Sequence, residues 1–369
     1  MTKAGTEEKV LQLLRSAEER KALTPLGIRL AGVVGRLAAI EKGNYELISA
    51  LGKEEQAAIG ARIRKGYREA FKGRGLEVVT TYKVRTKQSA EAFLQGLADY
   101  SGKKKYTMRP EGEDSVLRFY DLSAAYLRYK KSKAVQAPID SLNRDLRMGG
   151  AVRHICARIF TPAFGVRLDS LSFAGDLYDL YCLQFSLSKE MGREEYVRNS
   201  RELGSAFGKE DLEWLDFVNG AQDFLEKGPG ADVRGIQVSI ATPLLEDFLA
   251  SMDAAVSRKV ALDAVLRFTH AEAISPFAAL LGIPAASVPA SSIYQYRRHW
   301  QAGTVIPLSA NIQWILYSNG KDYLVKTLLN EKEVALPLPT TRYPYYRWED
   351  VRAYYRRYLS FNSPLSYAP

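Results

Sequence analysis

A short apolar segment that leads into a helix constrains the fold of this chain more than any other feature. Residues 76–81 are mostly apolar or β-branched, which is typical of a buried strand. A helix is expected from about residue 89 to 100, after a short loop that holds Arg85. A second apolar strand candidate, residues 259–268, also precedes a helix start. Strands that alternate with helices form mostly parallel sheets, so the sequence predicts an α/β fold.

The amino-terminal region is predicted to be helical. Residues 7–20 place apolar side chains at helical spacing among charged ones. Thr24 is expected to cap a second helix that begins at Pro25 and continues to about residue 40. A third helix is expected from residue 51 to about residue 71, with Gly73 and Gly75 as stop signals.

The middle of the chain changes character. Residues 102–257 show helical patterns, so we expect an α-helical lobe inserted into an α/β core formed by residues 1–101 and 258–369. Near the carboxyl end, residues 311–317 and 323–329 have the pattern of strands. Asn319 and Gly320 lie between them, and an Asn-Gly pair predicts a β-hairpin.

Composition limits the class of protein. With 369 residues, 46% of them hydrophobic, the chain can bury one large core or two smaller ones. It contains no run of about eighteen apolar residues, the length that a membrane span needs. Residues 1–9 lead into an amphipathic helix and have no signal-peptide core. Cys156 and Cys182 fit neither a metal site nor a disulfide framework, so their redox state stays open.

The formal net charge is +10 at pH 7, which suggests an anionic partner. Nucleic acid, an acidic membrane surface and a polyphosphorylated small molecule would each fit. The excess is modest for this length, and a lysine far from a binding site is more simply a solvated surface residue.

The strongest candidate site lies where the strand candidate 259–268 gives way to a helix. His270 and Glu272 are two residues apart there, and in an extended segment such residues project to the same side. That reasoning fails if the helix begins at Ala271. Together with Arg85, whose planar guanidinium matches phosphate oxygens, these groups suit phosphate chemistry.

Each of these residues has a structural alternative. Arg85 could be a surface arginine, and His270 a hydrogen-bonded histidine at a strand end. Glu272 could simply favour the amino terminus of a helix. Their occurrence together favours a functional site. His154 and His299, in contrast, are interpreted as structural residues.

The segment 78–97 with Arg85, followed by the His270-Ala271-Glu272 motif, resembles the histidine phosphatase superfamily. Within it the chain is most similar to the branch of acid phosphatases and phytases, in particular the multiple inositol polyphosphate phosphatases. Further similar segments are 117–122, 310–313 and 325–331. The resemblance implies a phosphoglycerate-mutase-like sheet flanked by helices, with an inserted, mainly α-helical lobe.

The resemblance also implies a reaction. Arg85 and His270 would bind the phosphate, and Glu272 would protonate the leaving alkoxide while His270 donates to the transferring phosphoryl group. The substrate would be an inositol polyphosphate such as phytate, the intermediate a phosphohistidine, and no cofactor or metal would be needed. By resemblance the enzyme would be periplasmic or secreted.

One part of the family pattern is missing. The nucleophilic histidine of the family lies in an Arg-His-Gly-x-Arg motif at the end of the first core strand, and residues 1–85 contain no such motif. We therefore expect the nucleophile to lie upstream of Met1. We also expect an open edge in the sheet, with apolar surface exposed around Val78 and Leu266.

Three alternatives remain. The segment 153–158 contains His154 but lacks the glycine of the motif and follows Arg85, so it is a poor substitute for the nucleophile. The chain could instead be a truncated remnant or a catalytically inactive protein that holds phosphate through Arg85 and His270. A nucleic-acid partner rests only on charge and on the aromatic, basic stretch 342–357, which we interpret as a packed final helix. We expect inositol phosphates as partners, and neither nucleic acid nor a membrane.

Overall fold

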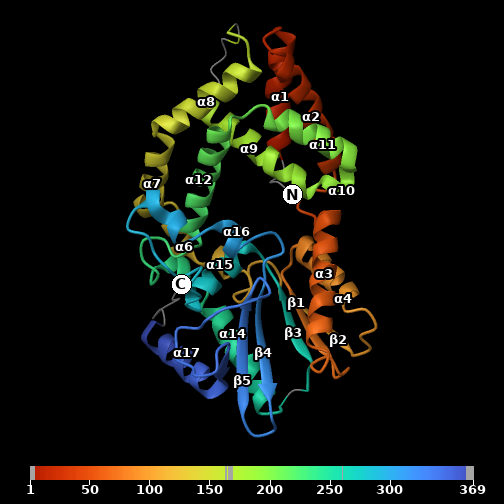
Figure 1. Cartoon of the computed structure of the whole chain (residues 1–369), viewed down its shortest axis with the longest axis vertical. Helices are drawn as coiled ribbons and strands as arrows, with labels where there is room; N and C mark the ends of the chain where they lie inside the picture. The colour runs from red at the N-terminus through yellow and green to blue at the C-terminus, as the bar shows by residue number, and fades with distance from the viewer. Residues whose placement is uncertain (1–4, 163, 165–168, 260, 363–369) are drawn as a thin grey trace. The chain divides into compact units, whose positions relative to one another are not determined.

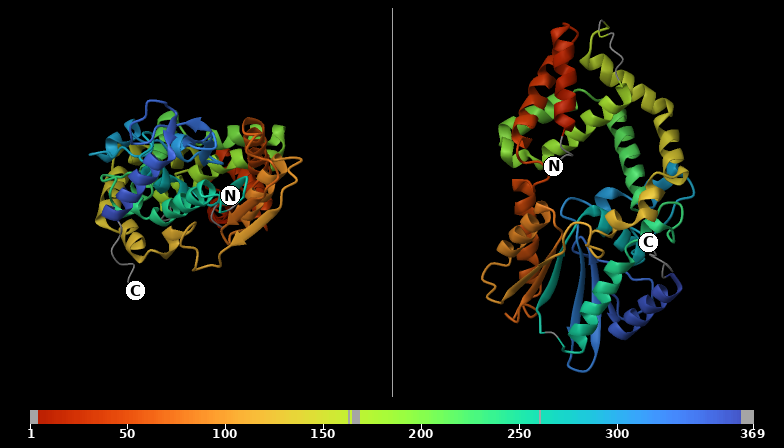
Figure 2. Two further views of the ribbon diagram at one scale, coloured as in Figure 1. Left: turned by 90° about the horizontal axis from the view of Figure 1, so that it is seen from below. Right: turned by 180° about the vertical axis from the view of Figure 1, so that it is seen from behind.

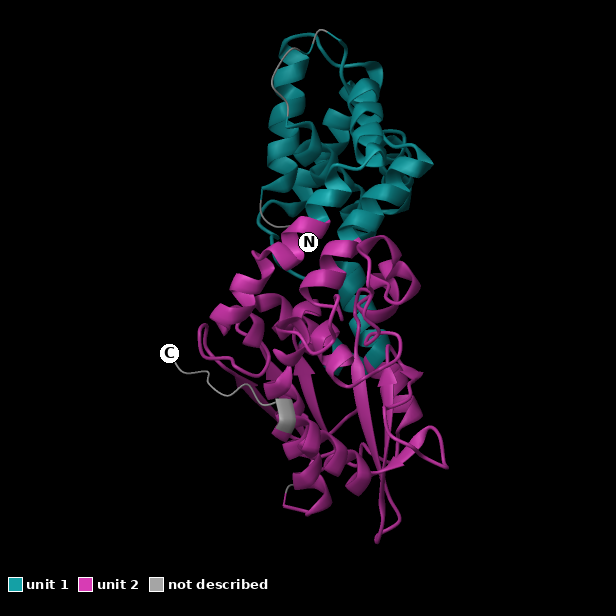
Figure 3. Cartoon of the chain, turned by 90° about the vertical axis from the view of Figure 1, so that its left-hand side faces the viewer, with its two compact units in different colours: residues 1–59, 91–96, 139–219 teal, residues 60–90, 97–138, 220–369 magenta. Residues whose placement is uncertain are grey.

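The computed structural model describes residues 5–162, 164, 169–259 and 261–362. The chain divides into two compact units, shown in different colours in Figure 3. Unit 1 comprises residues 1–59, 91–96 and 139–219, and unit 2 comprises residues 60–90, 97–138 and 220–369. Within the described residues, every strand belongs to unit 2 (Figure 3).

Unit 1 is helical. The hydroxyl of Thr24 accepts a hydrogen bond from the amide of Gly27 at 3.1 Å, which confirms the predicted cap of the second helix. The third helix ends at Gly66, earlier than predicted. The helices that lie wholly or partly in this unit include α1 (Thr6–Glu19), α2 (Pro25–Glu41), α3 (Ala50–Gly66), α8 (Leu146–Ile159), α9 (Ser170–Ser186), α10 (Ser188–Met191), α11 (Arg193–Gly204) and α12 (Lys209–Glu226).

Unit 2 contains a parallel sheet in the order β2-β1-β3. The central strand β1 (Leu76–Thr80) pairs with β2 (Lys104–Met108) on one side and with β3 (Ala264–Phe268) on the other. Helix α4 (Val84–Gly96) provides the crossover that parallel strands need between β1 and β2. The α/β fold class and the strands β1 and β3 are as predicted.

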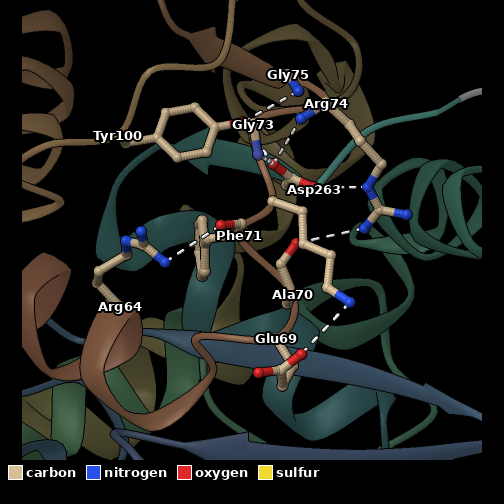
Figure 4. Close-up of polar contacts among 10 residues, drawn as sticks. Arg64, Glu69, Ala70, Phe71, Gly73, Arg74, Gly75, Tyr100 and Asp263 are labelled. Carbon is tan, nitrogen blue, oxygen red and sulfur yellow. Dashed lines mark hydrogen bonds and ion pairs between the residues drawn. The ribbon is translucent and has the colours of Figure 1, made fainter.

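The amino ends of β1 and β3 are tied together by Asp263 (Figure 4). Its carboxylate accepts hydrogen bonds from the amide of Gly73 at 2.7 Å and from Nε of Arg74 at 2.7 Å. The hydroxyl of Tyr100 donates to the same carboxylate at 2.7 Å and accepts from the amide of Gly75 at 3.0 Å. Burial acts to raise the pKa of Asp263. The hydrogen bonds from Arg74 and Tyr100 have the larger, opposite effect, so the pKa lies below its usual value.

The second sheet is built on the predicted hairpin. Strands β4 (Ile312–Ser318) and β5 (Tyr323–Leu329) are antiparallel, with β6 (Lys332–Glu333) and β7 (Tyr345–Arg347) also paired to β5. The side chain of Asn319 accepts from the amides of Lys321 and Asp322, at 2.9 and 2.7 Å, and so stabilises the turn.

The aromatic stretch near the carboxyl end packs within unit 2. Trp348, Val351 and Tyr355 are buried, and the hydroxyl of Tyr355 donates to the carbonyl of Leu281 at 2.7 Å. These residues lie on the last of the remaining helices, which are α5 (Phe119–Leu122), α6 (Ala124–Lys130), α7 (Lys133–Asn143), α13 (Ile236–Ser239), α14 (Thr242–Val256), α15 (Ala271–Leu280), the 3₁₀ helix η1 (Ile293–Arg298), α16 (Ala302–Val305) and α17 (Trp348–Asn362).

Strands β3 and β4 each have one edge without a neighbour among the described strands. β3 pairs only with β1, and β4 pairs only with β5. All residues of β3 and β4 keep part of their surface exposed to solvent, and the last residue of β4 is the most exposed. The expected open edge is therefore present. The prediction that Val78 is exposed is wrong, because Val78 lies on the central strand and is fully buried. Leu266, on the edge strand, is half-buried.

Helix α14 packs against both sheets, behind β4 and β5 in Figure 1 and in front of them in the right-hand view of Figure 2. The ring of Phe248 lies 4.5 Å from the guanidinium of Arg267 on β3. The same ring lies 5.5 Å from the ring of Trp314 on β4. One aromatic side chain thus contacts both β3 and β4.

The two compact units do not coincide with the predicted core and lobe. β2 and α14 fall within residues 102–257, where a helical lobe was expected, but both belong to unit 2. β2 has the composition of an exposed edge strand, with lysines that discourage further pairing, and so gave no apolar signal. The division at residues 102 and 257 stays a prediction. In the described part of the chain, no helix combines the length and apolar character needed to cross a membrane.

Candidate active site

The candidate residues lie where β1 and β3 end and their helices begin. Because the two strands are parallel, the amino ends of α4 and α15 lie at the same edge of the sheet. Arg85 is the second residue of α4, which begins earlier than predicted, so it belongs to the helix and not to the preceding loop. His270 is the N-cap residue of α15. Helix amino ends favour anions, so the backbone itself contributes to this edge.

The loop between β1 and α4 is fixed by buried hydroxyl groups. The hydroxyl of Thr86 lies 2.8 Å from the carbonyl of Lys83 and 3.0 Å from the hydroxyl of Thr81. Both threonines are buried. The hydroxyl of Thr81 also lies 3.3 Å from Nε2 of His270, so the loop contributes one wall around the imidazole.

Two arginines contact the imidazole of His270. Nε of Arg85 donates to Nδ1 at 3.2 Å, and Nη1 of Arg118 lies 3.1 Å from Nε2. A neutral imidazole has one acceptor nitrogen, so with Nδ1 accepting, Nε2 carries the proton. Arg118 and Nε2 then present donors to each other, an arrangement that a bound anion would satisfy by accepting from both.

Burial and positive charge keep His270 neutral. Desolvation is the largest influence, and with the charges of Arg85 and Arg118 it lowers the pKa of His270 to about 3. The charge of Glu272 raises the pKa of His270, but by less than these effects lower it. Near neutral pH the ring is therefore a neutral hydrogen-bond donor.

Arg118 is a site residue whose role was not predicted from the sequence. It directly precedes α5, and its guanidinium lies 4.9 Å from the ring of Tyr82 and 5.2 Å from that of Tyr120. It also forms an ion pair with Asp121. Its Nε is buried and has no hydrogen-bond partner in the described part of the chain. The resemblance of segment 117–122 was the only signal, and it did not single out the arginine.

Glu272 lies in the first turn of α15. Because that helix begins at Ala271, the expected strand-like projection of His270 and Glu272 to one side does not apply. The carboxylate of Glu272 lies 3.4 Å from Nζ of Lys227, which is 3.0 Å from the carboxylate of Asp223. Burial raises the pKa of Glu272, but Lys227 and the backbone amide of Glu272 bring it below its usual value.

The other histidines have separate surroundings. His154 lies on α8 in unit 1, where its Nδ1 is 3.1 Å from the carboxylate of Asp211. His299 follows η1 as its C-cap. Cys156 and Cys182 are both free thiols. Arg85 and His270 are thus brought together with Arg118, and the structural interpretation of His154 and His299 stays a prediction.

The positive charge of the chain is distributed unevenly between the two compact units. In unit 1 the acidic residues slightly outnumber lysine and arginine, so the positive excess of the chain falls in unit 2. The candidate site therefore lies in the unit that carries the positive charge. Such a field attracts polyanions.

Known proteins with related sequences support a family assignment. Residues 40–330 match the family model described as the histidine phosphatase superfamily, branch 2. Multiple inositol polyphosphate phosphatase 1 from Gallus gallus is 22% identical over 324 residues, which cover 84% of this chain and 68% of that protein. The Homo sapiens protein of the same name is 23% identical over 308 residues, which cover 77% of this chain and 60% of that protein.

Solved structures share the fold. The multiple inositol polyphosphate phosphatase of Bifidobacterium longum, in complex with inositol hexasulfate, superposes with a TM-score of 0.80 at 20% identity and covers 94% of this chain and 87% of its own. The phytase from D. castellii has a TM-score of 0.61 at 17% identity and covers 85% of this chain and 64% of its own. With the family model matched over most of its length, the chain belongs to branch 2 of the histidine phosphatase superfamily.

Proposed function

We propose that this protein is a phosphomonoester hydrolase of the inositol polyphosphate, or phytate, type. The observation that carries the proposal is the contact of Arg85 and Arg118 with one neutral imidazole, that of His270, beside two helix amino ends. The names of the relatives and the inositol hexasulfate bound to the Bifidobacterium longum protein support the same class of ligand.

The roles follow from the charges that develop during phosphoryl transfer. Arg85 and Arg118 would hold the equatorial oxygens, where guanidinium groups are worth most in a partly buried site. His270 would donate from Nε2 to the transferring phosphoryl group. Glu272 would protonate the leaving alkoxide, which requires its carboxylic acid form.

The nucleophile would be the histidine of an Arg-His-Gly-x-Arg motif carried by a strand outside residues 1–369. We place that strand between β3 and β4, whose edges are open and which both contact Phe248. Adjacent strands lie about 4.8 Å apart, so a single inserted strand separates its two neighbours by about twice that distance. A strand parallel to β3 would end beside His270, as an in-line nucleophile must.

A second candidate is a phosphate-binding protein without catalysis, either a pseudophosphatase or a remnant. It is favoured by one observation: of the described residues that form the site, His270 is the sole histidine, and a phosphohistidine intermediate needs another. Family resemblance suggests a periplasmic or secreted location for either candidate.

Calorimetric titration of the chain with inositol hexakisphosphate tests the shared part of both candidates. We expect weak binding, which Arg85→Ala and Arg118→Ala each reduce by about 10- to 100-fold, since a charge-assisted hydrogen bond contributes about 1.5–3 kcal/mol. Arg347→Ala is the matched control, because that arginine is exposed on β7 and pairs with Glu349. No binding, or equal losses in all three variants, would overturn the proposed site.

A further inference from the structure

Lys227 is a charged residue held between two carboxylates at the edge of the site. Its side chain is only 13% exposed, and Nζ lies 3.0 Å from Asp223 and 3.4 Å from Glu272. Removing an ammonium group from water costs free energy that its carboxylate partners must offset. Lys227 therefore depends on both partners, and one of them is the proposed acid of the reaction.

The backbone that carries Lys227 is fixed. Lys227 follows directly on α12, whose last carbonyls are bonded to hydroxyl groups from α6: Tyr126 donates to Glu226 at 3.0 Å and Tyr129 donates to Leu225 at 2.9 Å. These bonds leave the four-carbon side chain as the part of Lys227 that can move.

The titratable and charged groups that face Glu272 come from four elements. They are Lys227 after α12, with Asp223 behind it, His270 at the start of α15, Tyr120 from α5 and Tyr126 from α6. Burial raises the pKa of both tyrosines, so they are neutral, and His270 is neutral as well. Lys227 is thus the cation that pairs with Glu272 and favours its carboxylate form.

We propose that Lys227 is a positioning residue that couples anion binding at this site to protonation of Glu272. The inference rests on the proposed function, because it concerns the acid of that reaction. A carboxylate held by Lys227 has no proton to give to a leaving alkoxide. A polyanion bound by Arg85 and His270 offers Lys227 another negative partner and brings negative charge close to Glu272.

Both effects favour the carboxylic acid form of Glu272. As the anion binds, Lys227 moves from Glu272 to the anion and keeps its contact with Asp223, while Glu272 takes up one proton from solvent. In the reaction, the bond between phosphorus and the ester oxygen breaks, that oxygen takes the proton from Glu272, and Glu272 becomes a carboxylate again.

Inositol hexasulfate is the probe for this coupling, because sulfate esters stay fully ionised in mildly acidic buffer and any proton taken up must go to the protein. Calorimetry at about pH 6, in two non-phosphate buffers with different ionisation enthalpies, gives the number of protons bound with the ligand. We expect an uptake that Glu272→Gln abolishes in large part. What remains in that variant reports the contribution of His270.

Lys227→Met should raise the pKa of Glu272 in the free protein, measured by carbon-13 NMR of the carboxyl group, and reduce the linked proton uptake. Lys227→Arg keeps the charge and should retain the coupling, which separates it from a folding defect. Lys209→Met is the matched control, because Lys209 is exposed at the start of α12, the helix that precedes Lys227, and pairs with Glu213.

The outcomes separate the two proposals. Binding with equal proton uptake in the unmodified protein and in Lys227→Met, or in Glu272→Gln, would overturn the coupling and leave the proposed function standing. No binding of inositol hexasulfate or inositol hexakisphosphate would overturn the proposed function, and the coupling with it.

Discussion

Arg85 donates a hydrogen bond from Nε to Nδ1 of His270 at 3.2 Å, which joins the amino ends of two helices that follow parallel strands. This contact fixes the tautomer of His270 and directs the proton on Nε2 away from Arg85. Arg118 approaches the same Nε2 from another element, at 3.1 Å. Arg85, Arg118 and Nε2 of His270 are thus three hydrogen-bond donors that one phosphate group can share.

We predict that His270 stays neutral, with its proton on Nε2, throughout the pH range above about 4, because desolvation and the charges of Arg85 and Arg118 lower its pKa to about 3. Nitrogen-15 NMR of labelled histidine reports both the tautomer and the titration. Arg118→Gln should raise the pKa of His270, and so should bound sulfate. A ring that titrates near the usual value of about 6.5 in the folded protein would contradict this electrostatic picture.

The lowered pKa of His270 also predicts that the free energy of unfolding decreases at acidic pH. The folded state favours neutral His270, so its contribution is complete above the unfolded pKa of about 6.5 and is lost as pH falls towards the folded value. In His270→Gln the fall in urea-unfolding free energy between pH 6 and pH 4 should be smaller than in the unmodified protein. Equal pH slopes for the two proteins would count against a depressed pKa.

Asp263→Asn should destabilise unit 2 by about 2–3 kcal/mol at neutral pH, because the carboxylate accepts charge-assisted bonds from the loop before β1. The folded pKa of Asp263 is lowered, so its contribution is present above the unfolded pKa of about 3.9 and is lost as pH falls below it. Urea unfolding at two pH values measures both effects. Tyr100→Phe removes a single bond to Asp263 and should cost about 1 kcal/mol. A loss in Asp263→Asn that persists unchanged at about pH 3 would argue against this assignment.

Backbone amides along the unpaired edges of β3 and β4 should exchange with solvent faster than those of β1, which is paired on both sides. Hydrogen exchange followed by NMR compares the strands directly, with β1 as the internal control. Addition of a strand in the proposed position should slow exchange at both edges. Uniform slow exchange across β3, β1 and β4 in residues 1–369 would show that the edges are already covered.

In a form of the chain that carries the missing motif, Glu272→Gln should lower kcat by about 10²- to 10⁴-fold for an inositol phosphate, with KM little changed. The loss should be much smaller for p-nitrophenyl phosphate, whose leaving group needs no proton. Glu349→Gln, on an exposed residue of α17, serves as the control. Equal losses for both substrates would remove Glu272 from the role of acid.

The parts of the fold that the sequence predicts are those with a local signal. The apolar strands β1 and β3, the Thr24 cap and the hairpin at Asn319 depend on neighbouring residues only, and all are present. Strand β2 was not predicted, because it is an exposed edge strand with lysines and lacks an apolar pattern. Helix α4 begins at Val84, earlier than the predicted start at about residue 89, because a β-branched residue before an arginine gives little helix signal.

The candidate site divides in the same way. The His270-Ala271-Glu272 motif and Arg85 stand in recognisable local patterns. Arg118 and Lys227 reach the site through tertiary packing, the first between the rings of Tyr82 and Tyr120 and the second from the end of a helix that is remote in sequence. No pattern within either segment marks these two residues.

Phosphate release from phytate measures whether the residues of this chain suffice for catalysis. Residues 1–369 alone should hydrolyse phytate hardly at all, because Arg85, Arg118, His270 and Glu272 supply a clamp and an acid but no nucleophile. The same chain joined to an upstream strand with an Arg-His-Gly-x-Arg motif should release phosphate and form a phosphohistidine on that motif. Robust hydrolysis by residues 1–369 alone, abolished by His154→Ala, would contradict the account and make His154 the nucleophile.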